Sequence, residues 1–264
     1  MLRQAQRERF SLRCPYNYGP IRKNRIGLKN QREIGAIREG GNGLAIITID
    51  GPAGAGKSTV SRMLARRLNY LYLDTGAMYR AVALQVLKDR IDPGDERALE
   101  RLCKEISISF AEDPRGQRIL CQGEDVTEKI REPEVGWMAS TVSMKRPVRE
   151  AMVALQRKMG ERGGLVAEGR DTGTVVFPRA EAKFFLIADS RERAFRRFRE
   201  MKAKGKEARL EEVEAEVSKR DNQDSSRDLA PLKPAEDAHR IDSTGLTPEE
   251  VVERMLEALR ESLS

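Results

Sequence analysis

The chain has 264 residues, 39% of them hydrophobic, which is enough for one well-buried core, or one core with a subsidiary lobe, and predicts no more than two domains. Apolar runs such as "LAIITI" and "FFLIA" are far shorter than the roughly 18 residues of a membrane-crossing helix, so we expect no membrane association. The three cysteines, Cys14, Cys103 and Cys121, form no C-x-x-C pair. They argue against a disulfide framework or a zinc site and favour a cytoplasmic location.

The net charge of +7 is concentrated at the N-terminus. Residues 1–43 carry ten of the 49 Lys and Arg and three of the 42 Asp and Glu, so residues 44–264 contain 39 of each. The basic segment has no sustained apolar period, and we expect a flexible extension before a folded domain of residues 44–264. Its charge permits nucleic-acid binding without demonstrating it, and its three glutamates and single serine disfavour a transit peptide.

From residue 44 onward, short aliphatic runs alternate with helical stretches, which is typical of an α/β fold. Five runs predict buried strands of a parallel sheet covered on both faces: 44–49, 70–73, 164–168, 182–188 and 239–243. Between the second and third, "ISISF" and "RILCQG" flank a Pro- and Gly-containing stretch and predict an antiparallel hairpin in an inserted lobe. Near the C-terminus, Thr247, Pro248 and Glu250 predict the start of a structural helix.

Residues 51–58, "GPAGAGKS", match the phosphate-binding pattern G-x-x-x-x-G-K-[ST] at every fixed position. The glycines let backbone N–H groups surround phosphate oxygens, Lys57 adds charge at the outer phosphates, and Ser58 is placed to bind Mg²⁺. The match follows a predicted strand and continues into the amphipathic "STVSRMLARRL", as this mechanism requires. We therefore predict ATP or GTP binding by Gly51, Pro52, Ala53, Gly54, Ala55, Gly56, Lys57, Ser58 and Thr59.

A GTPase switch, an ATP-driven motor and a small-molecule phosphotransferase all use such a loop. The chain has no N-K-x-D motif for guanine, whereas Glu168 and Asp171 in "VAEGRD" leave a motor possible. Arg80 and Arg170 follow predicted strands, where open α/β sheets bind ligands, and favour the transfer of phosphate between two anions. Two further sets follow helical spacing: Arg193, Arg196 and Arg197, and then Arg220, Asp224 and Arg227.

The only histidine, His239, begins the last predicted strand and is interpreted as structural. A kinase that acts on an alcohol commonly uses a base, whereas a phosphate monoester is mostly dianionic at neutral pH and attacks without one. The pattern of few histidines and many arginines therefore favours a nucleoside monophosphate or similar acceptor. Asp74 or Asp171 could still serve as the base of an alcohol kinase.

Seven motifs between residues 44 and 264 carry a resemblance to a known family: "IDGPAGAGKST", "YLDTGAMYR", "GEDVTEKIR", "EGRDTGTVVFP", "ERAFRRF", "KRDNQDSSRDLAPL" and "IDSTGLT". In order and spacing they resemble the bacterial-type cytidylate kinases, which are P-loop nucleoside monophosphate kinases. The resemblance implies an α/β core with a five-stranded parallel sheet, an inserted monophosphate-binding lobe (about 76–158) with a small antiparallel sheet, and a short lid (about 196–212). It also implies ATP-dependent phosphorylation of CMP and dCMP to CDP and dCDP with Mg²⁺, which feeds pyrimidine nucleotide pools.

The resemblance further assigns roles to single residues. The catalytic residues would be Lys57, Arg170, Arg220 and Arg227, and Arg196 would close over ATP from the lid. The CMP site would comprise Thr75, Arg80, Ser140, Arg149, Arg170, Asp171, Arg220, Asp224 and Arg227. Within it, Arg80 would hold the CMP phosphate, Asp224 the ribose, and Ser140, Arg149 and Asp171 the cytosine.

Asp171 also predicts a base preference, because its carboxylate would repel the C4 oxygen of uracil. We therefore expect CMP to be used well above UMP, by a monomer whose partners are its small-molecule substrates. An RNA- or ribosome-associated P-loop ATPase that docks through residues 1–43 is the alternative of a different class.

Overall fold

The computed structural model describes residues 44–262 apart from 114–115, 204 and 228. The basic N-terminal extension predicted for residues 1–43 lies outside the described residues. In the described ranges, no helix is long and apolar enough to cross a membrane.

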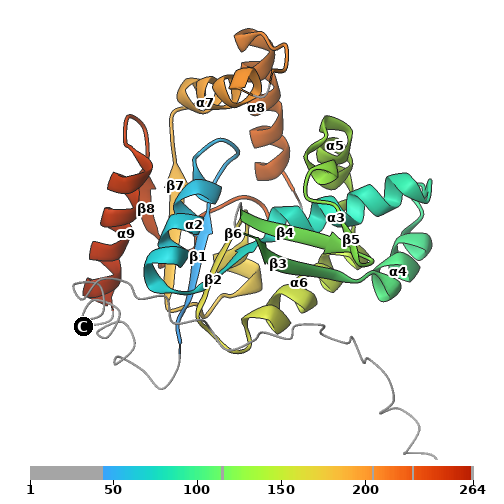
Figure 1. The fold of residues 1–264 in the computed structure, drawn as a ribbon, viewed down its shortest axis with the longest axis horizontal. Coiled ribbons are helices and arrows are strands. Elements are labelled where there is room, and N and C mark those ends of the chain that lie inside the picture. Colours follow the sequence, from blue (N-terminus) through green and yellow to red (C-terminus); the bar gives the residue numbers. More distant parts are fainter. Residues whose placement is uncertain (1–43, 114–115, 204, 228, 263–264) are drawn as a thin grey trace, which may run out of the picture.

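Five parallel strands form the central sheet, in the order β2-β6-β1-β7-β8 (Figure 1). Their bounds are Ile46–Asp50 (β1), Leu71–Asp74 (β2), Leu165–Gly169 (β6), Ala182–Ile187 (β7) and His239–Asp242 (β8). This confirms the predicted fold class. Because all five strands run in one direction, the residues that follow their carboxyl ends gather at one edge of the sheet.

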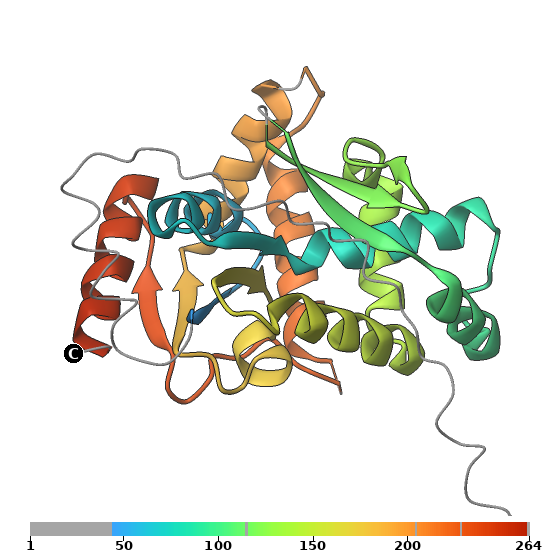
Figure 2. The same ribbon diagram turned by 60° about the horizontal axis from the view of Figure 1, so that its bottom comes forward.

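Helices cover both faces of this sheet (Figure 1, Figure 2). On one face, α2 (Lys57–Leu68) and α9 (Pro248–Ser262) share a buried apolar cluster with β1 and β7. On the other face, α3 (Thr75–Lys88) and α6 (Arg146–Gly160) contribute to a second cluster. The capping box of α9 is confirmed, since Thr247 N donates to Glu250 Oε2 at 2.8 Å and Glu250 N to Thr247 Oγ1 at 3.3 Å.

The segment between β2 and β6 contains the predicted antiparallel hairpin. Between α3 and α6 its elements are α4 (Glu96–Glu105), β3 (Ile108–Asp113), β4 (Gly116–Cys121), β5 (Glu124–Asp125), the 3₁₀ helix η1 (Lys129–Arg131) and α5 (Pro133–Val142). Strand β3 extends beyond "ISISF" to Asp113, and the two-residue β5 was not predicted. Gln117 Nε2 donates to Tyr72 O at 2.8 Å, so this small sheet contacts the edge strand β2.

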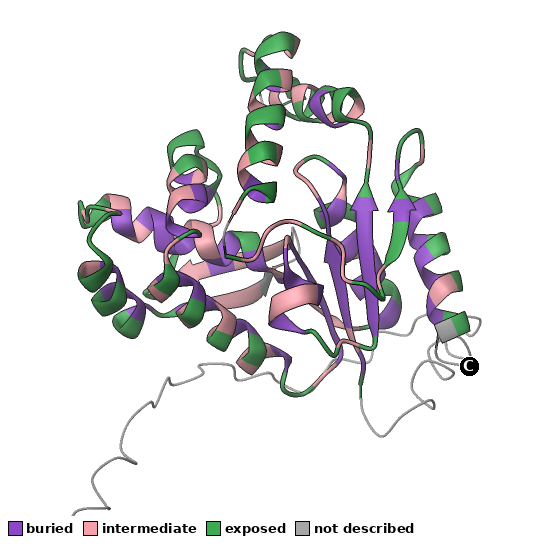
Figure 3. Ribbon diagram, turned by 180° about the vertical axis from the view of Figure 1, so that it is seen from behind, coloured by how far each residue is buried: buried purple, intermediate pink, exposed green. Residues whose placement is uncertain are grey.

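Two helices stand over the carboxyl edge of the sheet (Figure 1). They are α7 (Ser190–Ala203), which follows β7, and α8 (Leu210–Ser225). Their apolar contact is a small cluster of Ala194, Val213 and Val217, separate from the two large clusters. Figure 3 shows the strands mostly buried and the outer surfaces of α7 and α8 exposed. The hairpin of α7 and α8 therefore meets the sheet edge largely through polar side chains.

Candidate active site

The loop between β1 and α2 has the geometry of a phosphate-binding loop. Gly51, Gly54 and Gly56 have positive φ angles of 148°, 77° and 89°. A Cβ on Gly51 would lie 2.1 Å from the Leu186 carbonyl oxygen, so no other residue fits there. Gly56 caps α2 with its backbone alone and supplies no side-chain acceptor. The first N–H groups of α2 therefore face the loop, where an anion can accept from them.

Lys57, the first residue of α2, lies folded over this loop. Its Nζ donates to Pro52 O at 2.6 Å. Burial lowers the pKa of Lys57 to about 7, and the positive charges of Arg170 and Arg220 contribute, while Glu168 opposes them. A bound polyphosphate would supply negative charge and restore the proton. The ammonium group is thus placed to bind an anion in this loop.

Glu168, at the end of β6, lies against Ser58. It accepts hydrogen bonds from the Tyr72 hydroxyl and from the Ser58 side chain. Burial raises the pKa of Glu168 to about 7, with a contribution from Asp74. Ser58, Tyr72 and Asp74 also line one small pocket. Oxygen ligands are therefore gathered beside the hydroxyl that the sequence assigned to Mg²⁺.

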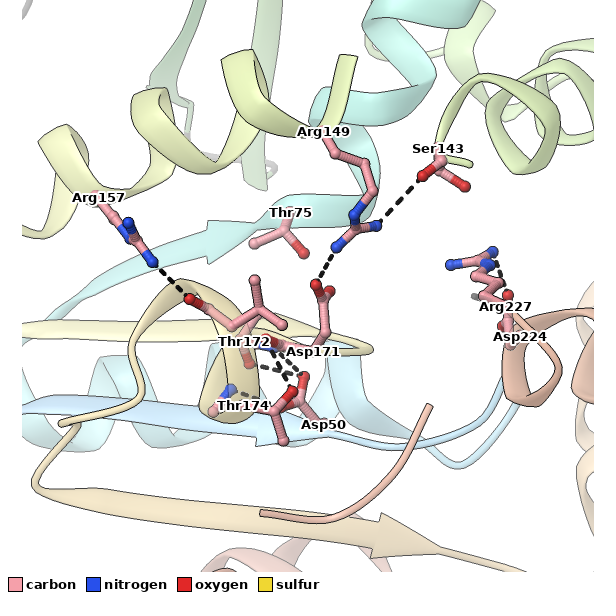
Figure 4. Close-up of polar contacts among 12 residues, drawn as sticks. Asp50, Thr75, Ser143, Arg149, Arg157, Asp171, Thr172, Thr174, Asp224 and Arg227 are labelled. Carbon is pink, nitrogen blue, oxygen red and sulfur yellow. Dashed lines mark hydrogen bonds and ion pairs between the residues drawn. The ribbon is translucent and has the colours of Figure 1, made fainter. Parts of the chain in front are cut away.

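Four arginines of the predicted site crowd together at the same edge of the sheet. Asp224 joins two of them, since it accepts from Arg170 Nε at 2.7 Å and pairs with Arg227 (Figure 4). Burial lowers the pKa of Arg220 to about 10, and both Arg170 and Arg80 contribute by repulsion. Within the described part of the chain, Arg220 Nε and Arg227 Nε have no hydrogen-bond partner.

Arg80 completes this cluster from α3. Its Nη1 donates to Ile130 O at 2.9 Å. Burial lowers the pKa of Arg80, while the attraction of Asp74 opposes this. Repulsion from three neighbouring arginines adds to the lowering: Arg197, Arg131 and Arg170. Buried guanidinium groups that repel one another form a site for an anion with several charges.

A buried ion pair of Arg149 and Asp171 lies next to the arginine cluster (Figure 4). Arg149 also donates to Ser143 O at 3.3 Å and stacks over the Tyr79 ring at 5.9 Å. Burial raises the pKa of Asp171, and the positive charge of Arg149 opposes the increase. The predicted Ser140 is buried nearby, where its carbonyl accepts from the Ser143 hydroxyl at 2.8 Å. The three residues assigned to cytosine are thus brought to one region.

Asp50 is a site residue that the sequence analysis missed. Its carboxylate accepts from Thr172 N at 2.9 Å, Thr172 Oγ1 at 2.7 Å and Gly173 N at 2.7 Å. These donors belong to the start of the π-helix η2 (Thr172–Val176), directly after Arg170 and Asp171 (Figure 4). Asp50 therefore connects the end of β1 to the turn that carries both residues.

The family model described as "Cytidylate kinase" matches residues 47–261 of this chain. The chain belongs to the cytidylate kinase family. The cytidylate kinase of Citrifermentans bemidjiense is 51% identical over 231 residues, which cover 88% of this chain and 98% of the relative. That of Enterococcus faecalis is 52% identical over 206 residues, 78% of this chain and 91% of the relative. Among solved structures, a shikimate kinase from Acinetobacter baumannii in complex with shikimate is similar with a TM-score of 0.40 and 18% sequence identity. The match covers 83% of this chain and 94% of that one.

Family membership makes the protein a nucleoside monophosphate kinase. Of the three classes of protein considered from the sequence, it is therefore the small-molecule phosphotransferase, not the GTPase switch or the ATP-driven motor. The three arginines of α7 differ in what they contact. Arg193 is buried, donates to Ala53 O at 3.1 Å and pairs with Asp221 at 2.7 Å, so it braces the phosphate-binding loop. Arg196 donates to Ser243 O at 2.7 Å, and its Nη1 would lie 3.9 Å from a Cβ on Gly56, which places it beside the loop.

Two placements complete the site. Arg197 repels Arg80 and Arg220, so it lies near the arginine cluster, although the family resemblance assigned it no role. The helical spacing of α7 was the only signal for it. Thr75 Oγ1 donates to Glu168 O at 2.7 Å and fixes the start of α3 to β6.

Proposed function

We propose that the protein transfers the terminal phosphoryl group of ATP directly to the phosphate of CMP or dCMP, in line and without a covalent enzyme intermediate. As a member of the cytidylate kinase family, it phosphorylates CMP and dCMP with ATP. One observation carries the mechanism: Gly169, directly before Arg170, pairs with Asp50, directly before the phosphate-binding loop. In agreement with this, Lys57 in that loop is repelled by Arg170 and Arg220. The two anion sites are therefore adjacent, as a direct transfer requires.

The donor side holds ATP through the loop of residues 51–59. Its backbone N–H groups and Lys57 bind the outer phosphates, and Arg196 approaches from α7. For Mg²⁺, the Ser58 hydroxyl with the Glu168 carboxylate beside it is a suitable set of oxygen ligands, because Mg²⁺ usually combines one or two protein oxygens with substrate phosphates. When bound there, the ion would neutralise phosphate charge during transfer.

The acceptor side holds the monophosphate through Arg80, Arg170, Arg220 and Arg227. Asp224 lies between Arg170 and Arg227, where one carboxylate can orient both guanidinium groups. We also assign to it the contact with the ribose hydroxyls. No general base is required. The positive charge of the cluster lowers the second pKa of the monophosphate, so the acceptor is present as the dianion that attacks.

Cytosine recognition falls to Arg149, Asp171 and Ser140. The exocyclic amine of cytosine donates to a carboxylate, and its N3 and O2 accept from a guanidinium. Arg149 and Asp171 are paired with each other, so a guanidinium and a carboxylate lie side by side, within reach of one base. Uracil presents an oxygen to Asp171 and is disfavoured.

The remaining features of the chain fit this reaction. We assign the segment of about 76–158 to the monophosphate-binding lobe and about 196–212 to a lid that excludes water on closing. Both described cysteines, Cys103 and Cys121, are free and buried, which suits a cytoplasmic enzyme. We expect it to act as a monomer.

A coupled assay of ADP release with CMP, dCMP, UMP, AMP and shikimate tests the substrate assignment. CMP and dCMP should give the highest kcat/KM, and equal turnover of UMP would contradict the role of Asp171. Removal of residues 1–43 tests the alternative of a docking ATPase. Unchanged phosphoryl transfer supports the kinase, whereas loss of RNA-stimulated ATPase activity would favour docking.

A further inference from the structure

Helix α5 has a glycine where its backbone does not need one. Gly136 lies in the first half of α5 and has ordinary helical geometry, without a positive φ. Glycine inside a helix is less stable than alanine, because it loses more backbone freedom on folding. The backbone of α5 would accept any good helix former at this position. The reason for glycine must therefore lie in the space around it.

That space is filled by the acceptor arginine. The three atoms nearest to a Cβ built on Gly136 all belong to the Arg80 guanidinium: Nη1 at 3.2 Å, Nη2 at 3.5 Å and Cζ at 3.7 Å. A separation of 3.2 Å is closer than a side-chain carbon normally approaches, so even alanine requires Arg80 to shift by a few tenths of an ångström.

The same segment also holds Arg80 through a hydrogen bond. Arg80 Nη1 donates to Ile130 O at 2.9 Å, and Ile130 belongs to η1, directly before α5. Among the described residues this is the only hydrogen bond found for the Arg80 side chain, which leaves Nη2 and Nε for a ligand. The guanidinium is therefore confined between the Ile130 carbonyl and the bare backbone of Gly136.

We propose that Gly136 is a positioning residue for the acceptor phosphate: the missing side chain on α5 sets where the Arg80 guanidinium lies. This inference rests on the proposed role of Arg80 at the CMP phosphate. A displaced guanidinium cannot keep its directed hydrogen bonds to phosphate oxygens, since these weaken with small errors of distance and angle. Side chains of increasing size at position 136 therefore weaken CMP binding in steps, while they favour the helix.

The test compares Gly136→Ala and Gly136→Leu, both of which favour a helix. The CMP KM and the CMP dissociation constant from calorimetry should rise about fivefold for Ala and about 100-fold for Leu, with the ATP KM unchanged. The thermal midpoint of Gly136→Ala should rise by about 2 °C, so lost affinity cannot be attributed to a weakened fold. Thr141→Ala is the matched control on the same helix. Among the described residues the Thr141 hydroxyl bonds only to Trp137 O, at 3.2 Å, and the CMP KM of the variant should stay unchanged.

Arg80→Met, measured in parallel, distinguishes an error in the role of Gly136 from an error in the role of Arg80. If Arg80→Met raises the CMP KM and both Gly136 variants leave it unchanged, the inference about Gly136 is wrong and the proposed site stands. If Arg80→Met leaves it unchanged, the assignment of Arg80 itself is wrong. An equal rise in the CMP and ATP KM values for the Gly136 variants would also overturn a positioning role at the acceptor.

Discussion

Asp50, the last residue of β1, offers the most direct test of how the strand before the phosphate-binding loop supports the proposed acceptor site. Its two carboxylate oxygens accept three hydrogen bonds, two from Thr172 and one from Gly173 N. Asp50→Asn preserves the shape of the side chain but replaces one of the two acceptor oxygens by an NH₂ group, which can only donate.

The loss can be estimated from these contacts. If the amide oxygen takes the place of Oδ1, both bonds from Thr172 remain, and Gly173 N faces the new NH₂ group. Two buried donors are then unsatisfied, and each costs about 1–3 kcal/mol. We expect the free energy of unfolding to fall by about 3 kcal/mol, which lowers the thermal midpoint by roughly 6–12 °C in a chain of this size.

Thr172→Val provides the graded control. It removes one hydroxyl donor, retains both backbone bonds to Asp50, and should cost only about 1 kcal/mol. Urea denaturation followed by circular dichroism measures both variants. The CMP KM of Asp50→Asn should also rise, because η2 begins directly after Asp171. The reasoning is refuted if Asp50→Asn unfolds within about 0.5 kcal/mol of the natural protein, or if Thr172→Val is equally damaging.

Two further predictions concern the bound substrates. Because burial leaves Lys57 with a pKa of about 7, the free protein loses this proton as the pH rises above 7. MgATP affinity should therefore weaken by up to about tenfold per pH unit, which calorimetry from pH 6.5 to 8.5 measures. A flat profile, or the same slope in Lys57→Arg, contradicts this prediction. Asp171→Asn should reduce kcat/KM for CMP by about 100-fold and for UMP by much less, since the carboxylate that accepts from cytosine and repels uracil is gone. An unchanged ratio of the two would remove Asp171 from base recognition.

The sequence predicted the parts of the fold that depend on local patterns. The five strands, the phosphate-binding loop and the cap of α9 each arise from residues adjacent along the chain. Boundaries were less accurate: β1 was expected at 44–49 and lies at Ile46–Asp50. The two-residue β5 is too short for any periodicity, because its pairing with β4 alone defines it.

The support of the site depends on distant contacts that no local pattern encodes. The bond from Thr172 N to Asp50 joins residues 122 positions apart. Arg193, Arg196 and Arg197 share one helix face by spacing, and the sequence could not separate them. Only the packing of α7 against the loop shows that Arg193 braces the backbone, whereas Arg197 lies near the acceptor arginines.

The arginine cluster explains why the free protein holds more positive charge at this edge than it can balance. Arg80 and Arg220 are both half-buried and repel each other, and among the described residues Asp224 is the one carboxylate that pairs with Arg170 and Arg227. Like charges that are partly removed from water cost free energy, so this cluster makes the protein less stable than a neutral cluster would. Asp224 limits this cost without neutralising the cluster. In the proposed mechanism the remaining charge would be balanced by the two phosphates, and most fully as negative charge spreads over the transferring group. The repulsion that destabilises the free protein thus favours the complex in which the transfer takes place.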